Sequence, residues 1–430
     1  MTLYEEALKA KVNHEILQIA EIEKVDVKTV MKSISKGQSV IMKRRNQIPL
    51  GIGLHFRTKI NVNIGTSTSL INLNEEIEKV RIAQKYGADT ISDLSMGGDI
   101  SAIRKKIIEC SIVPITTVPI YQAVAEAKSI INITEDTIFN LINEQIRNGI
   151  SSVVLHCGFS LEDLRKMKGK RIMGIVSKGG SLTIALMIEQ SIENPFLKNF
   201  DYLMEILRED DIVLNLGNAM RSGCVHDRVD GFHLSEIKMN SKLAKRANSN
   251  GIQVIIESLG GHVLAKDLME KIQLYKKITR NRPLFVSGPL PTDFAPGYDH
   301  ISAAIGGAIA SGYGADYLCA ITPAEHLSLP SVEDIKKGLI ACRIAAHVGD
   351  SMKFGLNHLF DNDLNLSKYR FQKNWPKQFD YSLDSEEPSK KHPINQEVCS
   401  MCGEYCALSL SKRFFSVNTK TLENNREKHW

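Results

Sequence analysis

Apolar runs of strand length alternate with amphipathic helical stretches from about residue 59 to residue 350. Eight of these runs are apolar along most of their length, which is typical of strands that are buried on both faces of a parallel sheet. The predicted strands are 89–94, 112–116, 152–156, 172–176, 211–216, 252–257, 283–288 and 315–320. Residues 60–64 form a further short run, which is either a ninth strand or a lead-in segment.

Helical periodicity fills the stretches between these strands. The predicted helices include 74–86, 134–147, 233–247 and 331–347, and the last has a capping signal in Ser331 and Asp334. Eight alternating β and α units favour a (β/α)8 barrel of the α/β class over a doubly wound sheet.

The domain organisation that follows has three parts. Residues 59–350 are expected to form the barrel with the site, residues 1–58 a small N-terminal region of short helices, and residues 351–430 a C-terminal region. The N-terminal helices are joined by a basic connection at residues 43–46. A charged, proline-bounded linker at 385–393 precedes a group of cysteines.

Composition excludes several classes of protein. The 54 basic and 49 acidic residues leave a net charge of +5 without a long basic block, so nucleic acid is not an expected partner. No stretch approaches 18 uninterrupted apolar residues, so no membrane span is expected, and the first residues do not resemble a secretory signal. Five scattered cysteines indicate reduced thiols and a cytoplasmic location: Cys110, Cys157, Cys224, Cys319 and Cys342.

Polar or glycine-rich turns follow nearly every predicted strand. Examples are the turns at 93–98, 156–158, 177–180 and 217–221. A single such turn is explained as a solvent-exposed connection. A parallel barrel, however, places all strand C-termini on one face, so eight of them together predict one site. Glycines at 177–180 let backbone amides approach a phosphate, and Ser177 and Lys178 add donors.

Two histidines give a second indication of chemistry on this face. His262 follows the sixth predicted strand and His326 the eighth, each near a carboxylate, Glu257 or Glu325. Two imidazoles on one barrel rim are able to hold a divalent metal ion with positions left for substrate. A single histidine on a loop is more often only a hydrogen-bonding residue.

Three cysteines lie within eight residues near the C-terminus, in Cys399-Ser-Met-Cys402-Gly-Glu-Tyr-Cys406. Three thiolates are one short of the set that saturates a [4Fe–4S] cluster, so one iron is left open for a substrate or cosubstrate. This arrangement is typical of enzymes that cleave S-adenosylmethionine reductively to make a carbon radical. A zinc knuckle completed by His392, or free thiols, fits the motif about as well.

Five sequence blocks carry a family resemblance. They are residues 61–67, 117–122, 174–180, 288–300 and 322–330, and the resemblance extends to the cysteines. The chain resembles the thiamine pyrimidine synthase family of radical S-adenosylmethionine enzymes. That resemblance implies a carbon–carbon lyase that rearranges 5-aminoimidazole ribotide, with the ribotide in a barrel and a metal ion on two histidines. It also implies an electron donor such as reduced flavodoxin or ferredoxin, and paired subunits, either a homodimer or a heterodimer with a paralogue.

The resemblance also assigns residues. The metal, zinc or another divalent ion, falls to His262 and His326, and the [4Fe–4S] cluster and its catalysis fall to Cys399, Cys402 and Cys406. The expected ribotide-binding residues are Asn63, Ser92, Tyr121, His156, Ser177, Lys178, Gly179, Asn218, Ala219, Met220, Arg221, Glu257 and Phe285.

Several departures from the family pattern fall at these positions. Asn218 replaces an aspartate, Ser92 a methionine, Lys178 an arginine and Phe285 a tyrosine. The loop before His262 is one residue longer, and the cysteine spacing is x2 then x3 rather than x2 then x4. Changed pocket residues on a retained scaffold predict a paralogue with altered chemistry.

The paralogue that fits this description makes 5-hydroxybenzimidazole, the precursor of a cobamide lower ligand, from the ribotide. One alternative is phosphomethylpyrimidine synthase itself, which makes 4-amino-5-hydroxymethyl-2-methylpyrimidine phosphate for thiamine. The other alternative is a non-catalytic partner subunit.

Overall fold

The computed structural model describes the chain except for residues 44–47, 128, 168, 393–397 and 415–430. It contains two compact units, Met1–Gly355 and Leu356–Trp430. No described helix is long and apolar enough to cross a membrane. Part of the basic connection at 43–46 and the end of the predicted linker at Pro393 lie outside the described residues.

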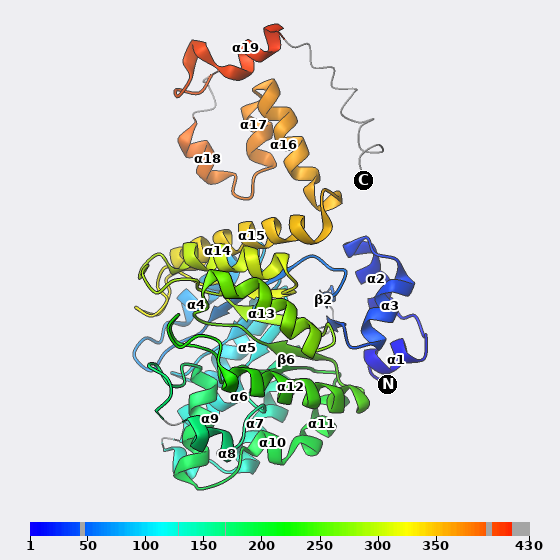
Figure 1. Ribbon diagram of the computed structural model, residues 1–430, viewed down its shortest axis with the longest axis vertical. Helices are drawn as coiled ribbons and strands as arrows, with labels where there is room; N and C mark the ends of the chain where they lie inside the picture. The colour runs from blue at the N-terminus through cyan, green and yellow to red at the C-terminus, as the bar shows by residue number, and fades with distance from the viewer. Residues whose placement is uncertain (44–47, 128, 168, 393–397, 415–430) are drawn as a thin grey trace. The chain divides into compact units, whose positions relative to one another are not determined.

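A closed barrel of eight parallel strands forms the centre of the first unit (Figure 1). The strands pair in the order β10-β3-β4-β5-β6-β7-β8-β9, so each neighbour follows the last in the chain until β10 closes on β3. The strands are β3 (Lys59–Ile64), β4 (Thr90–Asp93), β5 (Ile115–Thr117), β6 (Ser152–Leu155), β7 (Val213–Leu216), β8 (Val254–Glu257), β9 (Leu284–Ser287) and β10 (Tyr317–Cys319). The predicted (β/α)8 barrel is therefore confirmed.

Helices surround this barrel, and most of them begin at a polar side chain that caps the first turn. Asn72, Asp99 and Thr134 each accept a hydrogen bond from a backbone amide three residues later, which satisfies a donor that the helix leaves free. The helices are α4 (Leu73–Lys85), α5 (Ile100–Cys110), α6 (Pro119–Ala127), α7 (Glu135–Asn148), α8 (Leu161–Met167), α9 (Lys178–Glu189), α10 (Pro195–Lys198), α11 (Phe200–Glu209), α12 (Gly231–Ser249), α13 (Ala265–Ile278), α14 (Asp299–Gly312) and α15 (Val332–Phe354).

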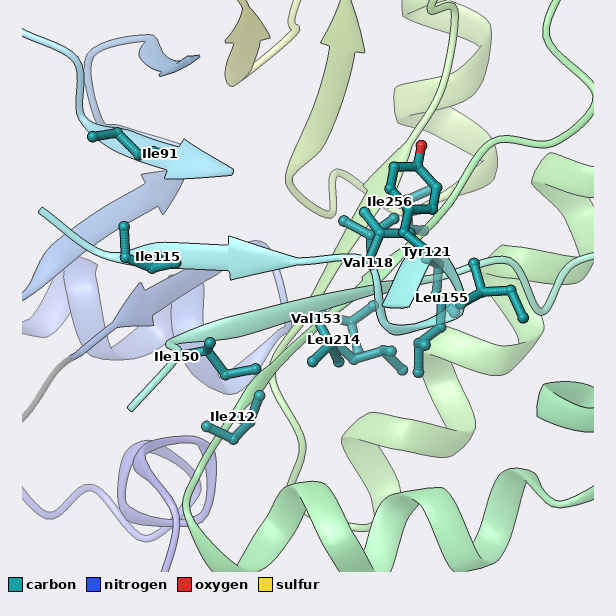
Figure 2. Packing of buried hydrophobic residues seen from close by; sticks show 14 of the residues in the cluster. Ile91, Ile115, Val118, Tyr121, Ile150, Val153, Leu155, Ile212, Leu214 and Ile256 are labelled. Carbon is teal, nitrogen blue, oxygen red and sulfur yellow. The ribbon is translucent and has the colours of Figure 1, made fainter. Parts of the chain in front are cut away.

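Branched apolar side chains of the strands pack against these helices and make the main core. Figure 2 shows Ile91, Ile115, Val153, Leu214 and Ile256, which come from five successive strands. All five are fully buried, and each such side chain contributes about 1.5–3 kcal/mol when it leaves water. The core therefore holds the strand ends, and the turns that follow them, in fixed positions.

The N-terminal region forms three helices and a hairpin. The helices are α1 (Leu3–Leu8), α2 (His14–Glu23) and α3 (Val27–Ser35), and the hairpin joins β1 (Ser39–Met42) to β2 (Leu50–Gly53). The sequence predicted the helices but not the hairpin. Val40, Met42 and Ile52 of the hairpin pack with barrel residues, and Gln253 exchanges two hydrogen bonds of 2.7 and 3.1 Å with the backbone of Ile41.

One predicted strand is wrong. Residues 172–176 are irregular, and the first barrel strand is instead β3, Lys59–Ile64, which includes the short run at 60–64. Ile172 is 74% exposed, and the carboxylate of Asp227 accepts hydrogen bonds from the amides of Ile172 and Met173 in place of a neighbouring strand. Gly174 also adopts a left-handed φ of 64°, which interrupts an extended run.

The second unit is made of short helices. They are η2 (His358–Phe360), α16 (Asp361–Gln372), α17 (Trp375–Asp380), α18 (Glu386–Lys391), η3 (Gly403–Tyr405) and α19 (Ala407–Phe414). The segment predicted as a linker therefore contains α18. Few side chains of this unit are buried, and among its described residues the buried ones are Phe360, Phe379 and Gln378.

Candidate active site

A cavity of about 350 Å³ opens where the barrel strands end. Its walls come from the turns after the strands, as the convergence of polar turns on one barrel face predicts. Ten of the residues that the resemblance assigns to the ribotide or the metal line it: Asn63, Ser92, Tyr121, His156, Ser177, Lys178, Arg221, Glu257, Phe285 and His326. Gly179, Asn218, Ala219, Met220 and His262 are not among the lining residues.

Asn61, which the sequence did not single out, links several polar side chains at the base of the cavity by hydrogen bonds. Asn61 accepts hydrogen bonds of 2.9 Å from the hydroxyls of Thr90 and Ser92, and its amide donates to Asn63 Oδ1 at 2.8 Å. Asn63 and Ser92 are thereby oriented within the cavity wall. Two asparagines at alternate positions of an otherwise apolar strand were the available signal, because alternate side chains of a strand share a face.

His156 is held neutral at the side of the cavity. Burial, reinforced by the positive charge of Arg221, lowers the pKa of His156 to about 3. Its Nε2 lies 3.0 Å from Ser177 Oγ, and Ser177 also accepts from the amide of Gly180 as the N-cap of α9. A Cβ on Gly179 would come within 2.3 Å of the His156 ring, so glycine is required for this approach.

Lys178 and Tyr121 lie next to this helix start. The Lys178 ammonium is 5.4 Å from the centre of the Tyr121 ring. Burial raises the pKa of Tyr121 to about 12, and the phenol oxygen accepts a hydrogen bond from the backbone of Gly179. A cation, a phenol and the positive end of the α9 dipole therefore meet in one place, which is a setting that favours a phosphate group.

Glu257 and Arg221 both line the cavity. Burial raises the pKa of Glu257 to about 7, while the charge of Arg221 and two hydrogen bonds oppose this rise. Those hydrogen bonds come from the amide of Asn218 at 3.3 Å and from Asn215 Nδ2 at 3.2 Å. The carboxyl group is thus able to gain or lose a proton near neutral pH.

His262 and His326 come together although 64 residues separate them. Their Nε2 atoms are 3.4 Å apart. Two nitrogens that bind one tetrahedral ion at about 2.0–2.1 Å are separated by about 3.4 Å, so the pair fits a shared divalent metal. Asp293 lies 2.5 Å from Nδ1 of His262, which is how a carboxylate orients a metal-binding imidazole. Asp299 lies farther from its histidine, at 3.8 Å from Nδ1 of His326.

The backbone around these histidines explains how the longer loop is accommodated. Leu259 and Gly261 adopt left-handed φ angles of 48° and 83°, which fold the additional residue into a tight turn. His326 itself has a φ of 63°, an unusual conformation for a residue with a side chain. Within the described residues, no group of three or more His, Cys, Asp or Glu side chains is arranged to hold a metal ion. The histidines therefore offer two ligands, and other ligands would come from water or substrate.

The three terminal cysteines are partly exposed and free. Hydrogen bonds from the amide and hydroxyl of Ser409 lower the pKa of Cys406, which directly precedes α19. Partial desolvation and the neighbouring Cys399 raise the pKa of Cys402. The His392 ring, the alternative fourth ligand of a zinc site, stacks on Trp375 with 3.8 Å between the ring centres.

Two comparisons by sequence, with a family model and with individual proteins, cover almost the whole chain. The model of the radical SAM ThiC family matches residues 2–413. A phosphomethylpyrimidine synthase of Thermoanaerobacter sp. (strain X514) is 43% identical over 434 residues, which cover 98% of this chain and 100% of that protein. The corresponding protein of Pyrococcus furiosus is 43% identical over 432 residues, with the same coverage. Among solved structures, a Yersinia pestis dihydropteroate synthase gives a TM-score of 0.39 at 12% identity and covers 71% of this chain and 96% of that one.

These relatives correct the predicted product. The departures from the family pattern predict a 5-hydroxybenzimidazole synthase of cobamide biosynthesis, but the full-length relatives are phosphomethylpyrimidine synthases, which was the alternative. The prediction of partners depended on that product, so it is wrong as well, including the expected paralogous subunit. One of the departures has a physical reason not to alter the product: the side chain of Asn218 donates to Glu236 and does not line the cavity. With a family match over residues 2–413 and relatives 43% identical from end to end, this chain belongs to the radical SAM ThiC family of enzymes.

Proposed function

We propose that this chain is a phosphomethylpyrimidine synthase of thiamine biosynthesis, a lyase that rearranges 5-aminoimidazole ribotide to 4-amino-5-hydroxymethyl-2-methylpyrimidine phosphate. The observation that carries the proposal is the 43% identity, over the full length, with phosphomethylpyrimidine synthases. The cavity supports it, because its donors and acceptors suit a phosphorylated ribose that carries a small aromatic amine.

The proposed ribotide contacts follow from the charges in the cavity. The N-terminus of α9, with Ser177 and Lys178, binds the phosphate, because the positive end of the helix dipole and an ammonium both favour an anion. Arg221 adds a second cation to the cavity wall. Glu257 and Asn63 accept hydrogen bonds from the ribose hydroxyls or from the amine.

The proposed metal site uses His262 and His326. Their 3.4 Å separation fits one ion, zinc or another divalent metal, and Asp293 orients His262. When bound there, such an ion supplies a Lewis acid beside Glu325 and the substrate. Burial raises the pKa of Glu325, which therefore also holds a proton more readily than a free carboxyl group.

The family implies a [4Fe–4S] cluster and S-adenosylmethionine. In the proposed assignment Cys399, Cys402 and Cys406 hold three irons of the cluster, whose open iron and bound S-adenosylmethionine supply the carbon radical. A one-electron donor is required. The lowered pKa of Cys406 favours the thiolate that binds iron.

The decisive experiment identifies the product by mass. The reconstituted protein is incubated anaerobically with 5-aminoimidazole ribotide, S-adenosylmethionine and a reductant, and the Cys402→Ala variant serves as the control. The proposal expects a pyrimidine that keeps its phosphate, and none from the variant. A fluorescent benzimidazole without phosphate, or no product from protein with a full cluster, would overturn it.

A further inference from the structure

The turn after β7, residues 217–221 and hereafter the β7 loop, has its carbonyl groups held by buried side chains. Asn240 of α12 donates to the carbonyl of Gly217 at 3.2 Å. Arg171 donates to the carbonyls of Met220 and Arg221 at 2.8 and 3.2 Å. The side chain of Arg171 is only 1% exposed and is also paired with Asp230, so its own position is fixed.

The amides on the other side of the β7 loop converge on one carboxylate. Glu236, one helical turn before Asn240 on α12, accepts from the amide of Ala219 at 2.8 Å and from the amide of Met220 at 2.9 Å. It also accepts from the side-chain amide of Asn218. Glu236 is 1% exposed, and no cation among the described residues forms an ion pair with it. A buried carboxylate with three donors and no counter-ion costs desolvation energy, so its position requires an explanation.

The residue types at this contact suit a carboxylate specifically. Two backbone amides and one side-chain amide all donate, and only a carboxylate offers acceptors on both oxygens. Glutamine at position 236 would turn an NH2 group towards a donor. Aspartate at position 218 would place an acceptor against Glu236 in a buried site, where two carboxylates repel each other unless one takes a proton.

We propose that Glu236 is a positioning residue for ribotide binding, which fixes the β7 loop and thereby holds Arg221 in the cavity. Glu236 itself is not among the cavity-lining residues, whereas Arg221 is, so its effect passes through the loop backbone. This inference rests on the proposed function, since it takes Arg221 as a ligand of the ribotide. An arginine loses less conformational freedom on binding when its backbone is already fixed. The affinity for the ribotide is therefore higher.

A double-mutant cycle tests whether Glu236 acts through Arg221. The affinity for 5-aminoimidazole ribotide is measured by calorimetry for the full-length protein and for Glu236→Gln, Arg221→Ala and the double variant. We expect Glu236→Gln to weaken binding at least about fivefold in the native background and less than about twofold once Arg221 is absent. Equal weakening in both backgrounds, or no weakening in the native one, overturns the proposal.

Asn218→Asp is the second variant, and it keeps the test valid if Glu236→Gln fails to fold. It should weaken ribotide binding in the same Arg221-dependent manner, and an effect that persists in the Arg221→Ala background overturns the proposal. Asp350→Asn is the matched control. Asp350 is also a buried carboxylate, and it accepts from the amide of Thr58 at 3.0 Å and from its hydroxyl at 2.7 Å, but it lies outside the cavity lining. This control should lower thermal stability and leave ribotide affinity unchanged.

The cycle also separates the two proposals. If Arg221→Ala does not weaken ribotide binding, the ribotide site assigned under the proposed function is wrong, and the role of Glu236 is wrong with it. If Arg221→Ala weakens binding but Glu236→Gln adds the same factor in both backgrounds, the ribotide site is upheld and only the positioning role is overturned.

Discussion

The cavity of the barrel and the cysteine segment differ in what holds their functional groups. In the cavity, Asn63, His156 and Arg221 are attached to buried strands and turns, and hydrogen bonds between side chains fix several of their atoms. Cys399, Cys402 and Cys406 are partly exposed, lie on a short turn and at a helix start, and have little core beneath them.

The two regions therefore obtain the geometry of their functional groups in different ways. The proposed ribotide site is formed by folding, because the core that buries the strands also fixes the turns after them. In the cysteine segment, the described residues provide three thiols but no arranged metal site. Binding of the cluster is therefore expected to order this segment, as metal binding does in other small domains with little core.

The largest expected effect is that of Cys402→Ala, which should change the cysteine segment and leave the barrel unaffected. Cys402→Ala should abolish cleavage of S-adenosylmethionine and reduce the iron and sulfide content far below about four of each per chain. Ribotide affinity and the thermal unfolding of the barrel should stay unchanged, since Cys402 belongs to the second unit and not to the barrel core. Stoichiometric zinc without iron–sulfur absorption in the native protein would contradict the assignment, as would a loss of ribotide binding in the variant.

Replacing a proposed metal ligand should have the next largest effect. His326→Ala should weaken divalent metal binding by more than about 100-fold, and Asp293→Asn by about 10- to 100-fold, because Asp293 orients His262. Competition with a chromophoric chelator measures both affinities. His358→Ala, which changes a histidine of the second unit, is the control and should bind metal normally. Equal metal affinity in the native protein and His326→Ala would exclude this site.

A smaller effect tests how tightly the cavity wall is packed. Gly179→Ala should cost about 1–3 kcal/mol and weaken ribotide binding, because the new Cβ would meet the His156 ring at 2.3 Å. Gly231→Ala is the matched control at the start of α12, where a Cβ would have no neighbour within 4 Å. Thermal unfolding and ribotide titration of both variants measure the contrast. Equal stability and equal ribotide affinity of the two variants would contradict the prediction, because the backbone at Gly179 could then move away from His156 at little cost.

The last expected effect is a pH dependence of stability, which concerns the barrel alone. Burial raises the pKa of Glu236 from 4.5 to about 7, so the folded state binds this proton more tightly than the unfolded state. The contribution of Glu236 to the free energy of unfolding is therefore greatest below pH 4.5 and falls, by at most about 3 kcal/mol, as the pH rises to 7. Denaturant unfolding at about pH 5 and about pH 8 should show a smaller fall for Glu236→Gln than for the native protein. Identical falls would contradict the raised pKa.

Local sequence patterns predicted most of the barrel. Seven of the eight predicted strands are present, because apolar runs between turn signals are typical of buried parallel strands. The strand predicted at 172–176 is absent, because a run of five mostly apolar residues is also compatible with an irregular segment. The turn residues and the His262–His326 pair could be placed on one face because the barrel topology directs every strand end there.

Sequence patterns are therefore enough to predict the barrel, the face on which the polar turns converge, the cysteine motif and, by resemblance, the family. Which of the predicted residues line the cavity depends on the tertiary fold. Asn218 turns towards Glu236 on α12, and Asn61 orients Asn63 and Ser92, contacts that no spacing in the chain encodes. The reason is physical: periodicity reports how a residue faces its own strand or helix, whereas a side chain's partner depends on which elements the fold brings against it.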